Sequence, residues 1–294
     1  MSAIKKQSIR ERARSAMKSA YYSPAVRTVA FGPLDAFDRL RGRRDPLVPP
    51  RRLQYVGRRE DFAAVGADWR DRLIRDQGIG PGSDVLDIGS GIGRVAVALV
   101  PELTEGSYEG FDIVPGFIDW CSREITPRHP SFRFRLADVR NRQYNPRGGV
   151  PPAEYRFPFG DDGFDAALAA SVFTHMEPNG VRRYLEEAHR VLRHGAELVC
   201  TFFLVDEEAE RLLAAAGPAF SLDHRLVDAE GAPYLAADAR VPEFCVGILE
   251  PQLIAAAADV GFEVAGIERG WWSGREVGPG APYQDVVTLR KPGG

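Results

Sequence analysis

One stretch of the chain decides the fold: Asp84-Val-Leu-Asp-Ile-Gly-Ser-Gly-Ile-Gly-Arg94. It opens with a short apolar run, of the kind that forms a buried strand. Three glycines then alternate with other residues, and the helical pattern of residues 95–100 follows at once. Glycine lets the backbone turn sharply and approach a ligand, and a helix start adds free N–H groups. The stretch predicts a strand, a turn and a helix, and the turn either binds a ligand or only joins the two elements.

Strands and helices alternate on both sides of this stretch, which indicates a parallel sheet with helices on both faces. We therefore expect an α/β fold of the Rossmann-like kind, with a mostly parallel seven-stranded sheet. Helices are expected at residues 60–77, 95–100, 115–125, 181–192 and 251–260. Strands are expected at residues 85–88, 108–111, 132–136, 164–170, 197–204, 262–267 and 285–289.

Two long segments interrupt the alternation and suggest the domain organisation. A loop at residues 140–160 is rich in Pro, Gly and Arg, and an insertion at residues 205–249 separates two core elements. Connections of this length in compact domains are commonly lids or binding loops. We expect a basic, partly helical N-terminal arm at residues 1–52, followed by one domain at residues 53–294 that carries this loop and a cap insertion.

The composition is that of an ordinary globular protein, with 44% hydrophobic and 27% charged residues among 294. No apolar run reaches the roughly 18 residues that a membrane-spanning helix needs, and no apolar leader follows the start. Cys121, Cys200 and Cys245 are far apart, so neither a disulfide scaffold nor a zinc ribbon is expected. These features favour a reducing compartment, and we expect a cytoplasmic location.

Charge is distributed unevenly within the net charge of −3. Residues 1–60 contain 15 Lys and Arg against 5 Asp and Glu, whereas the remaining residues contain 23 against 36. A basic arm on an acidic body suits contact with an anionic surface or an acidic glycan. A solvated arm, or one that docks on its own acidic body, explains the same pattern.

Three carboxylates follow or end the first three strands of the expected sheet. Asp87 ends the first strand, Asp112 the second, and Asp138 follows the third. Open α/β sheets bind ligands at the carboxyl ends of their strands, and a carboxylate about 20 residues after a glycine turn commonly binds a ribose. Although a single Asp at a strand end is usually a cap or a turn residue, three in register favour a nucleoside-type ligand.

With these motifs, residues 80–205 resemble the class I S-adenosylmethionine-dependent methyltransferases. The resemblance rests on Val85-Leu-Asp-Ile-Gly-Ser-Gly-Ile-Gly, on Phe157-Pro-Phe-Gly-Asp-Asp-Gly-Phe-Asp-Ala and on Arg190-Val-Leu-Arg-His-Gly-Ala-Glu-Leu. It implies S-adenosyl-L-methionine as cofactor and S-adenosyl-L-homocysteine as product. The cofactor-binding residues that it implies are Asp87, Gly89, Ser90, Gly91, Gly93, Asp112, Ile113, Asp138, Val139 and Ser171.

The resemblance also implies a role for each part of this set. The three glycines line the methionine part, and Asp87 reaches its amino group. Asp112 binds the ribose hydroxyls with Ile113 against the adenine, and Asp138 accepts from the adenine amino group. A nicotinamide dehydrogenase is the main rival, but its fingerprint needs a third glycine where this chain has Arg94.

A hydroxyl or ammonium acceptor must lose a proton during methyl transfer, and a general base contributes about 10²–10⁴-fold there. His175 is the first candidate, because it follows the fourth strand and an imidazole accepts a proton near neutral pH. Alternatively, His175 forms a hydrogen bond with the next loop or with the cofactor carboxylate. Glu177 is the reserve candidate, although an acid is also favoured at the start of a helix. No metal site is expected, since His and Cys do not recur at ligand spacing.

The acceptor is the least specified part of the hypothesis. Aromatic residues suggest a pocket for a ring, although packing explains them as well: Tyr55, Trp69, Tyr144, Tyr155, Phe157, Trp271, Trp272 and Tyr283. Nucleic acid is disfavoured, because Ala169-Ala-Ser-Val-Phe stands where amino-methylating DNA enzymes carry an Asn/Asp-Pro-Pro-aromatic motif. We expect O-methylation of a sugar, a glycan or a small hydroxylated metabolite. N-methylation of a small molecule and a non-catalytic cofactor-binding protein are the alternatives, and the sequence does not specify an oligomeric state.

Overall fold

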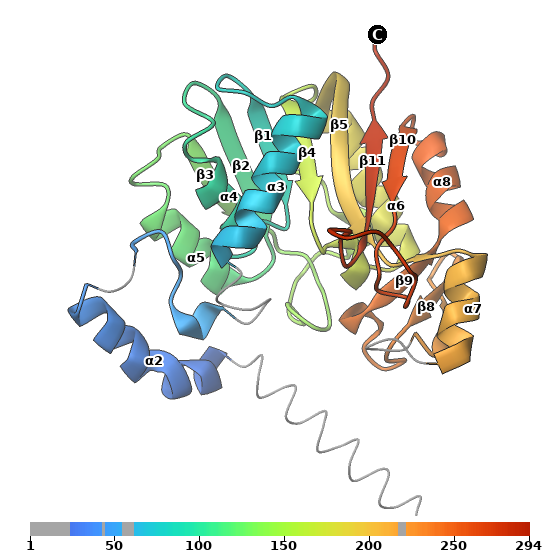
Figure 1. The fold of residues 1–294 in the computed structure, drawn as a ribbon, viewed down its shortest axis with the longest axis horizontal. Coiled ribbons are helices and arrows are strands. Elements are labelled where there is room, and N and C mark those ends of the chain that lie inside the picture. The colour runs from blue at the N-terminus through green and yellow to red at the C-terminus, as the bar shows by residue number, and fades with distance from the viewer. Residues whose placement is uncertain (1–23, 43–44, 55–61, 217–221) are drawn as a thin grey trace, which may run out of the picture.

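The computed structural model describes residues 24–42, 45–54, 62–216 and 222–294, and its centre is a seven-stranded sheet (Figure 1). Four strands come from the N-terminal half of the domain, and three from the C-terminal half. They are β1 (Asp84–Ile88), β2 (Ser107–Asp112), β3 (Phe132–Leu136), β4 (Phe164–Ala169), β5 (Leu192–Phe202), β10 (Glu263–Glu268) and β11 (Asp285–Arg290).

The strand order β10-β11-β5-β4-β1-β2-β3 places β1 in the interior of the sheet. β1 pairs in parallel with both β2 and β4, and β11 is antiparallel to its two neighbours. The chain moves outward through β2 and β3 and then returns to the other side of β1 at β4. Ligands bind in α/β sheets at such a change of direction. The expected α/β fold with a mostly parallel sheet is confirmed.

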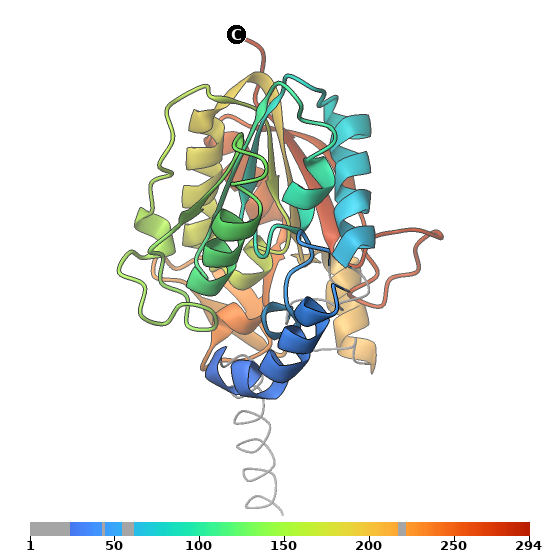
Figure 2. The same cartoon turned by 90° about the vertical axis from the view of Figure 1, so that its left-hand side faces the viewer.

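Helices cover both faces of the sheet, as the two perpendicular views show (Figures 1 and 2). α3 (Phe62–Gln77), α4 (Arg94–Leu99) and α5 (Pro115–Glu124) share one hydrophobic cluster with Val85 of β1. α6 (Pro178–Val191) and α8 (Glu250–Asp259) share the other cluster with Leu86, the next residue. Successive strand residues point to opposite faces, so a continuous apolar run fills both layers.

A second, smaller sheet packs at the carboxyl ends of the main strands. It has the order β6-β9-β8-β7, and α7 lies beside it (Figure 1). The bounds are β6 (Leu204–Val205), α7 (Glu207–Ala216), β7 (His224–Val227), β8 (Pro233–Ala236), η4 (Pro242–Phe244) and β9 (Val246–Leu249). Its strands have two to four residues, too few for a periodicity to stand out in the sequence. We refer to residues 204–249 as the cap.

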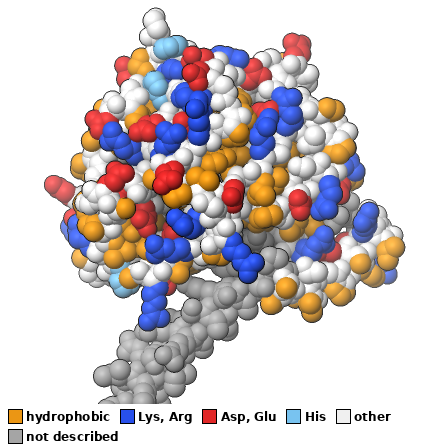
Figure 3. Space-filling view, turned by 180° about the vertical axis from the view of Figure 1, so that it is seen from behind, with side chains coloured by type: hydrophobic (Ala, Val, Ile, Leu, Met, Phe, Trp, Pro, Cys, Tyr) orange, Lys and Arg blue, Asp and Glu red, His pale blue; other side chains and the backbone are white. Residues whose placement is uncertain are grey.

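At the N-terminal side, α2 (Pro24–Leu40) rests on a short turn, η1 (Arg51–Leu53), and forms a projection from the body (Figure 3). Leu53 reaches the domain, where it packs with Phe62, Ile92 and Phe117. Residues 1–23 of the expected N-terminal arm and Tyr55 lie outside the described part of the chain. Among the described residues, no helix is long and apolar enough to cross a bilayer.

Asp285 joins the cap to the main sheet. Its buried carboxylate accepts hydrogen bonds from the Leu204 backbone N–H (2.8 Å), the Gly270 backbone N–H (2.9 Å) and Trp272 Nε1 (2.6 Å). Each of these donors would lose its partner if the carboxylate were removed, and an unsatisfied buried donor costs about 1–3 kcal/mol.

We expect Asp285→Ala to lower the free energy of unfolding by about 2–3 kcal/mol, measured by urea denaturation. Asp259→Ala is the matched control, because Asp259 is 58% exposed and its ion pair with Arg182 lies at the surface. Its effect should stay within about 0.5 kcal/mol. Equal effects of the two substitutions would contradict this role of Asp285.

Candidate cofactor and acceptor site

The glycine turn after β1 has a left-handed backbone at each glycine. φ is +77° at Gly89, +54° at Gly91 and +72° at Gly93, a region that side chains strongly disfavour. A Cβ on Gly89 would also lie 2.4 Å from Val172 Cγ2. The turn therefore requires glycine for conformation and, at Gly89, for the close approach of the segment that follows β4.

Asp112 organises this turn from the end of β2. Its two carboxylate oxygens accept hydrogen bonds from the Gly91 N–H (2.9 Å) and the Val114 N–H (2.8 Å). Burial raises the pKa of Asp112 to about 6, so the group is mostly ionised at neutral pH. Each oxygen retains a second lone pair, with which it can accept a hydrogen bond from a ligand hydroxyl.

Asp87 lies beneath the turn and is 3% exposed. Its carboxylate accepts a hydrogen bond from the Tyr108 hydroxyl. Burial raises its pKa to about 7, and the charge of Asp112 acts in the same direction. A cationic ligand group near Asp87 would favour its ionised form, since an opposite charge lowers the pKa of a carboxyl group.

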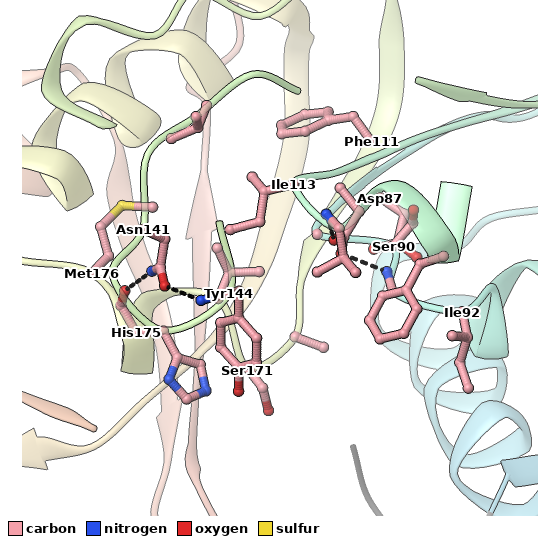
Figure 4. Close-up of a pocket in the computed structure, with 18 of the residues that line it drawn as sticks. Asp87, Ser90, Ile92, Phe111, Ile113, Asn141, Tyr144, Ser171, His175 and Met176 are labelled. Carbon is pink, nitrogen blue, oxygen red and sulfur yellow. Dashed lines mark hydrogen bonds between the residues drawn. The ribbon is translucent and has the colours of Figure 1, made fainter. Parts of the chain in front are cut away.

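A cavity of about 250 Å³ extends from the glycine turn along the strand ends. Figure 4 shows Ser90 and Ile92 on one side of it, and His175, Tyr144 and Ser171 on the other. The Ser90 hydroxyl is buried and has no hydrogen-bond partner among the described residues. A buried polar group without a partner is costly, and a ligand in the cavity would supply one.

Ser171 begins the segment after β4 with φ at +58°. Its N–H donates to Thr201 Oγ1 (2.7 Å) and its hydroxyl to Gln284 Oε1 (2.8 Å). Two other segments of the chain therefore hold this residue in a conformation that serine rarely adopts. Such backbone outliers cluster at ligand sites.

His175 ends η3 (Phe173–His175), a single turn between β4 and α6. Its Nδ1 lies 2.9 Å from the backbone carbonyl of Glu243 in the cap. Because a carbonyl only accepts, Nδ1 carries the proton in the neutral ring and Nε2 holds the free lone pair. Burial lowers the pKa of His175, and this effect outweighs that of the nearby carbonyls. The imidazole is thus neutral near pH 7.

Two further residues hold His175 in position. Asn141 Nδ2 donates to the His175 carbonyl (3.0 Å), and Asn141 Oδ1 accepts from the Tyr144 N–H (2.9 Å). The Tyr144 ring meets the imidazole edge to face, with centroids 5.1 Å apart. Figure 4 shows this arrangement, in which the loop after β3 and the turn after β4 are joined through Asn141.

A second cavity of about 180 Å³ lies under the cap. It shares part of its lining with the first cavity, including His175 and Arg140. Charged residues from three segments line the remainder: Arg142, Glu177 and Glu243. Glu243 Oε2 is buried without a hydrogen-bond partner among the described residues. His175 therefore stands between a cavity at the glycine turn and a polar cavity under the cap.

The structure brings most of the expected cofactor residues to the first cavity. Its lining includes Asp87, Gly89, Ser90, Gly91, Asp112, Ile113, Val139, Ser171 and His175. Gly93 lies behind it, where a Cβ would come 2.7 Å from Ile125 Cδ1. Asp138 is exposed, and its Oδ1 accepts from the Gly149 N–H (3.1 Å). Glu177 lines only the second cavity, in which burial and the charge of Glu243 raise its pKa.

Of the aromatic residues expected near the acceptor, some line the first cavity and the others pack elsewhere in the fold. Trp69 and Tyr144 line the first cavity, whereas Phe157 and Tyr155 pack in the core beside α6. Trp272 is buried against Phe203 under the cap. The Trp271 side chain is half exposed and meets Tyr283 edge to face.

Sequence reasoning missed Arg140, Asn141, Arg142 and Glu243. The first three follow the third strand directly, so their position after a strand end was a usable signal for a site. Glu243 gave no such signal. It is 68 residues from His175 in the sequence, and only the fold of the cap brings the two residues together. Within the described ranges, no group of three His, Cys, Asp or Glu side chains is placed to hold a metal ion.

Comparison with known proteins gives a family for the central part of the chain. Residues 86–200 match the sequence model of the family described as a methyltransferase domain. Among solved structures, the cyclase SpnF shares 18% identity and a TM-score of 0.49, with 78% of this chain and 81% of that chain covered. A SAM-dependent methyltransferase of Methanosarcina mazei shares 18% identity and a TM-score of 0.47, with coverage of 76% and 98%.

A third structure is the 1,6-didemethyltoxoflavin-N1-methyltransferase of Burkholderia thailandensis, with bound 1,6-didemethyltoxoflavin and S-adenosylhomocysteine. It shares 20% identity and a TM-score of 0.45, with 79% of this chain and 84% of that chain covered.

The segment that matches the family model runs from β1 into β5. It therefore includes the glycine turn, Asp112 and His175, which the fold gathers around one cavity. The family match rests on sequence, and the cavity rests on geometry. Residues 86–200 of this chain are a methyltransferase domain that uses S-adenosylmethionine.

Proposed function

We propose that the enzyme methylates a hydroxyl group of a small polar acceptor, such as a sugar or another hydroxylated metabolite, with His175 as general base. The observation that supports this most is the place of His175 in the wall shared by the two cavities. A base must contact the acceptor where the acceptor meets the methyl donor, and this shared wall is such a place.

The residues of the first cavity fit S-adenosylmethionine. At Gly91 the turn faces open space, because no described atom lies within 4 Å of where a Cβ would stand, and the buried Ser90 hydroxyl needs a partner. Asp112 would bind the ribose hydroxyls through the free lone pairs of its carboxylate, and Asp87 would attract the amino group of the methionine part. Bound there, S-adenosylmethionine supplies a methyl group already activated by its sulfonium.

The chain's own residues then position the acceptor and take its proton. Nε2 of His175 would hold and then take the hydroxyl proton of the acceptor, while bound S-adenosylmethionine would supply the methyl group and leave as S-adenosylhomocysteine when its methyl–sulfur bond breaks. The Glu243 carbonyl holds the opposite ring nitrogen at 2.9 Å, which fixes the tautomer and stabilises the imidazolium that results. Holding the two reactants in line contributes roughly 7–11 kcal/mol of barrier lowering, so position matters more here than the base.

The second cavity favours an acceptor rich in hydrogen-bonding groups. Glu177 and Glu243 offer acceptors to hydroxyl groups, and Arg140 and Arg142 offer donors. Arg142 Nε lies 3.5 Å from Glu243 Oε1, which leaves Oε2 for a ligand. An amine acceptor is the second candidate, because two carboxylates also stabilise an ammonium group.

A label-transfer survey tests the proposal. Methyl-labelled S-adenosylmethionine is incubated with the enzyme and a bacterial extract split into nucleic acid, protein, lipid and glycan, and small-molecule fractions. We expect label in the small-molecule or glycan fraction, as a methyl ether by mass spectrometry. Asp112→Asn protein is the control, because loss of cofactor binding should remove the signal. Label on nitrogen, or label in the protein or nucleic-acid fraction, would contradict the proposal.

A further inference from the structure

The helix α2 presents its apolar face to solvent. Val29 is 80% exposed, Leu40 87%, and Phe37 46%. Their spacing of eight and three residues places them on one side of a helix. In Figure 3 hydrophobic side chains gather along the outer edge of α2, where it projects from the body. Contiguous exposed apolar groups mark interaction sites.

The polar face of the same helix is buried instead. Arg27 and Asp35 are each 4% exposed. Arg27 donates to the carbonyls of Arg52 (2.8 Å), Arg51 (2.9 Å) and Gln54 (3.1 Å). Asp35 accepts from the Arg51 N–H (2.6 Å) and from Arg52 Nη1 (3.1 Å). Rotating α2 about its axis to bury its apolar side would break these hydrogen bonds. The hydrogen bonds of Arg27 and Asp35 therefore keep the apolar side facing solvent.

The positive charge of the N-terminal region favours an anionic surface as the partner of α2. Residues 1–60 carry 15 Lys and Arg against 5 Asp and Glu. Among the described residues, Arg39 lies in the last turn of α2, and the Arg41 guanidinium covers the Phe37 ring at 4.2 Å. The two acids of α2, Asp35 and Asp38, are both paired with arginines of η1. An apolar stripe with basic neighbours is the pattern of helices that lie on anionic membranes.

A second copy of the chain fits this face less well. Two such arms facing one another would bring like charges together, which is unfavourable at short range. We propose that the outer face of α2, with Val29, Phe37 and Leu40 at its centre, docks on the surface of a bilayer that contains anionic lipid.

The position of α2 gives this docking a consequence for the enzyme. α2 lies at the end of the molecule that holds the carboxyl ends of the strands (Figures 1 and 2). Its turn η1 contacts the wall of the first cavity, because Leu53 packs with Ile92 and Phe117, which line it. Docking would therefore hold the site end of the domain close to the membrane, in reach of acceptors at that surface.

Vesicle flotation with the full chain tests the proposal. One vesicle set is pure phosphatidylcholine, and the other also contains phosphatidylglycerol. We expect binding to the anionic set only, weakening as salt rises. Val29→Asp/Leu40→Asp should lower binding at least about tenfold, because it removes apolar area and adds negative charge. Val227→Asp/Ile254→Asp is the matched control, with the same charge change at side chains 65% and 43% exposed.

The alternatives give different results. Equal loss of binding in the two double variants would show a general charge effect and overturn the assignment to α2. Undiminished binding by Val29→Asp/Leu40→Asp would assign it to other basic residues of the chain. A concentration-dependent dimer that these substitutions disrupt, without vesicle binding, would assign the face to a second copy. Urea unfolding and S-adenosylhomocysteine binding must match the wild type, which separates docking from folding and from the methyltransferase site.

Discussion

Asp112→Asn is expected to weaken the binding of S-adenosylhomocysteine at least about a hundredfold. Asp112 accepts from the N–H groups of Gly91 and Val114 with its two oxygens. Asparagine has only one oxygen, so its NH₂ group must face one of these N–H donors. The glycine turn would lose a charge-assisted hydrogen bond, and the ribose would lose an acceptor. Together these cost about 3 kcal/mol, or roughly a hundredfold in affinity.

Isothermal titration calorimetry measures this affinity directly, without knowledge of the acceptor. Asp119→Asn is the matched control, because Asp119 is an exposed residue of α5 and lies outside the cavity. Its affinity for S-adenosylhomocysteine should equal that of the wild type. If Asp112→Asn also kept the wild-type affinity while remaining folded, Asp112 would not be a ribose ligand.

The main sheet was predictable because its signals are local. The apolar run before Gly89 and the helix after it lie next to each other in the chain, and they specify β1 and α4 without distant contacts. Asp112 could be found in the same way, because its distance from the glycine turn follows from the length of one helix and one strand. The alternating pattern then extended the sheet to its seven strands.

The features that the sequence did not reveal depend on contacts between segments that are distant in the chain. Glu243 reaches His175 across 68 residues, and the cap strands are too short for a periodicity. The segment after β3 turns Asp138 outward to Gly149, although its place in the sequence matches an adenine ligand. α2 departs from the usual rule that apolar faces point inward, because Arg27 and Asp35 anchor its polar side. Tertiary packing decides each of these cases.

His175→Gln is expected to lower kcat by about 10²–10⁴-fold on the true acceptor, the range of general-base catalysis. Glutamine can donate to the Glu243 carbonyl as Nδ1 does, but its amide does not take up a proton near neutral pH. Cofactor affinity should therefore remain near the wild-type value, and the loss should appear in the chemical step. His224→Gln is the matched control, because His224 is exposed on β7 of the cap.

The pH profile separates His175 as a base from His175 as a structural residue. Burial lowers its pKa below the ordinary value of 6.5, and only the neutral ring accepts a proton. The wild-type kcat should rise with pH through that lowered pKa and stay level above it. In His175→Gln this acidic limb should disappear, whereas a packing role would reduce kcat and keep the limb. If Glu177→Gln removes the limb instead, the base is Glu177, whose pKa is raised by burial, and His175 only positions the acceptor.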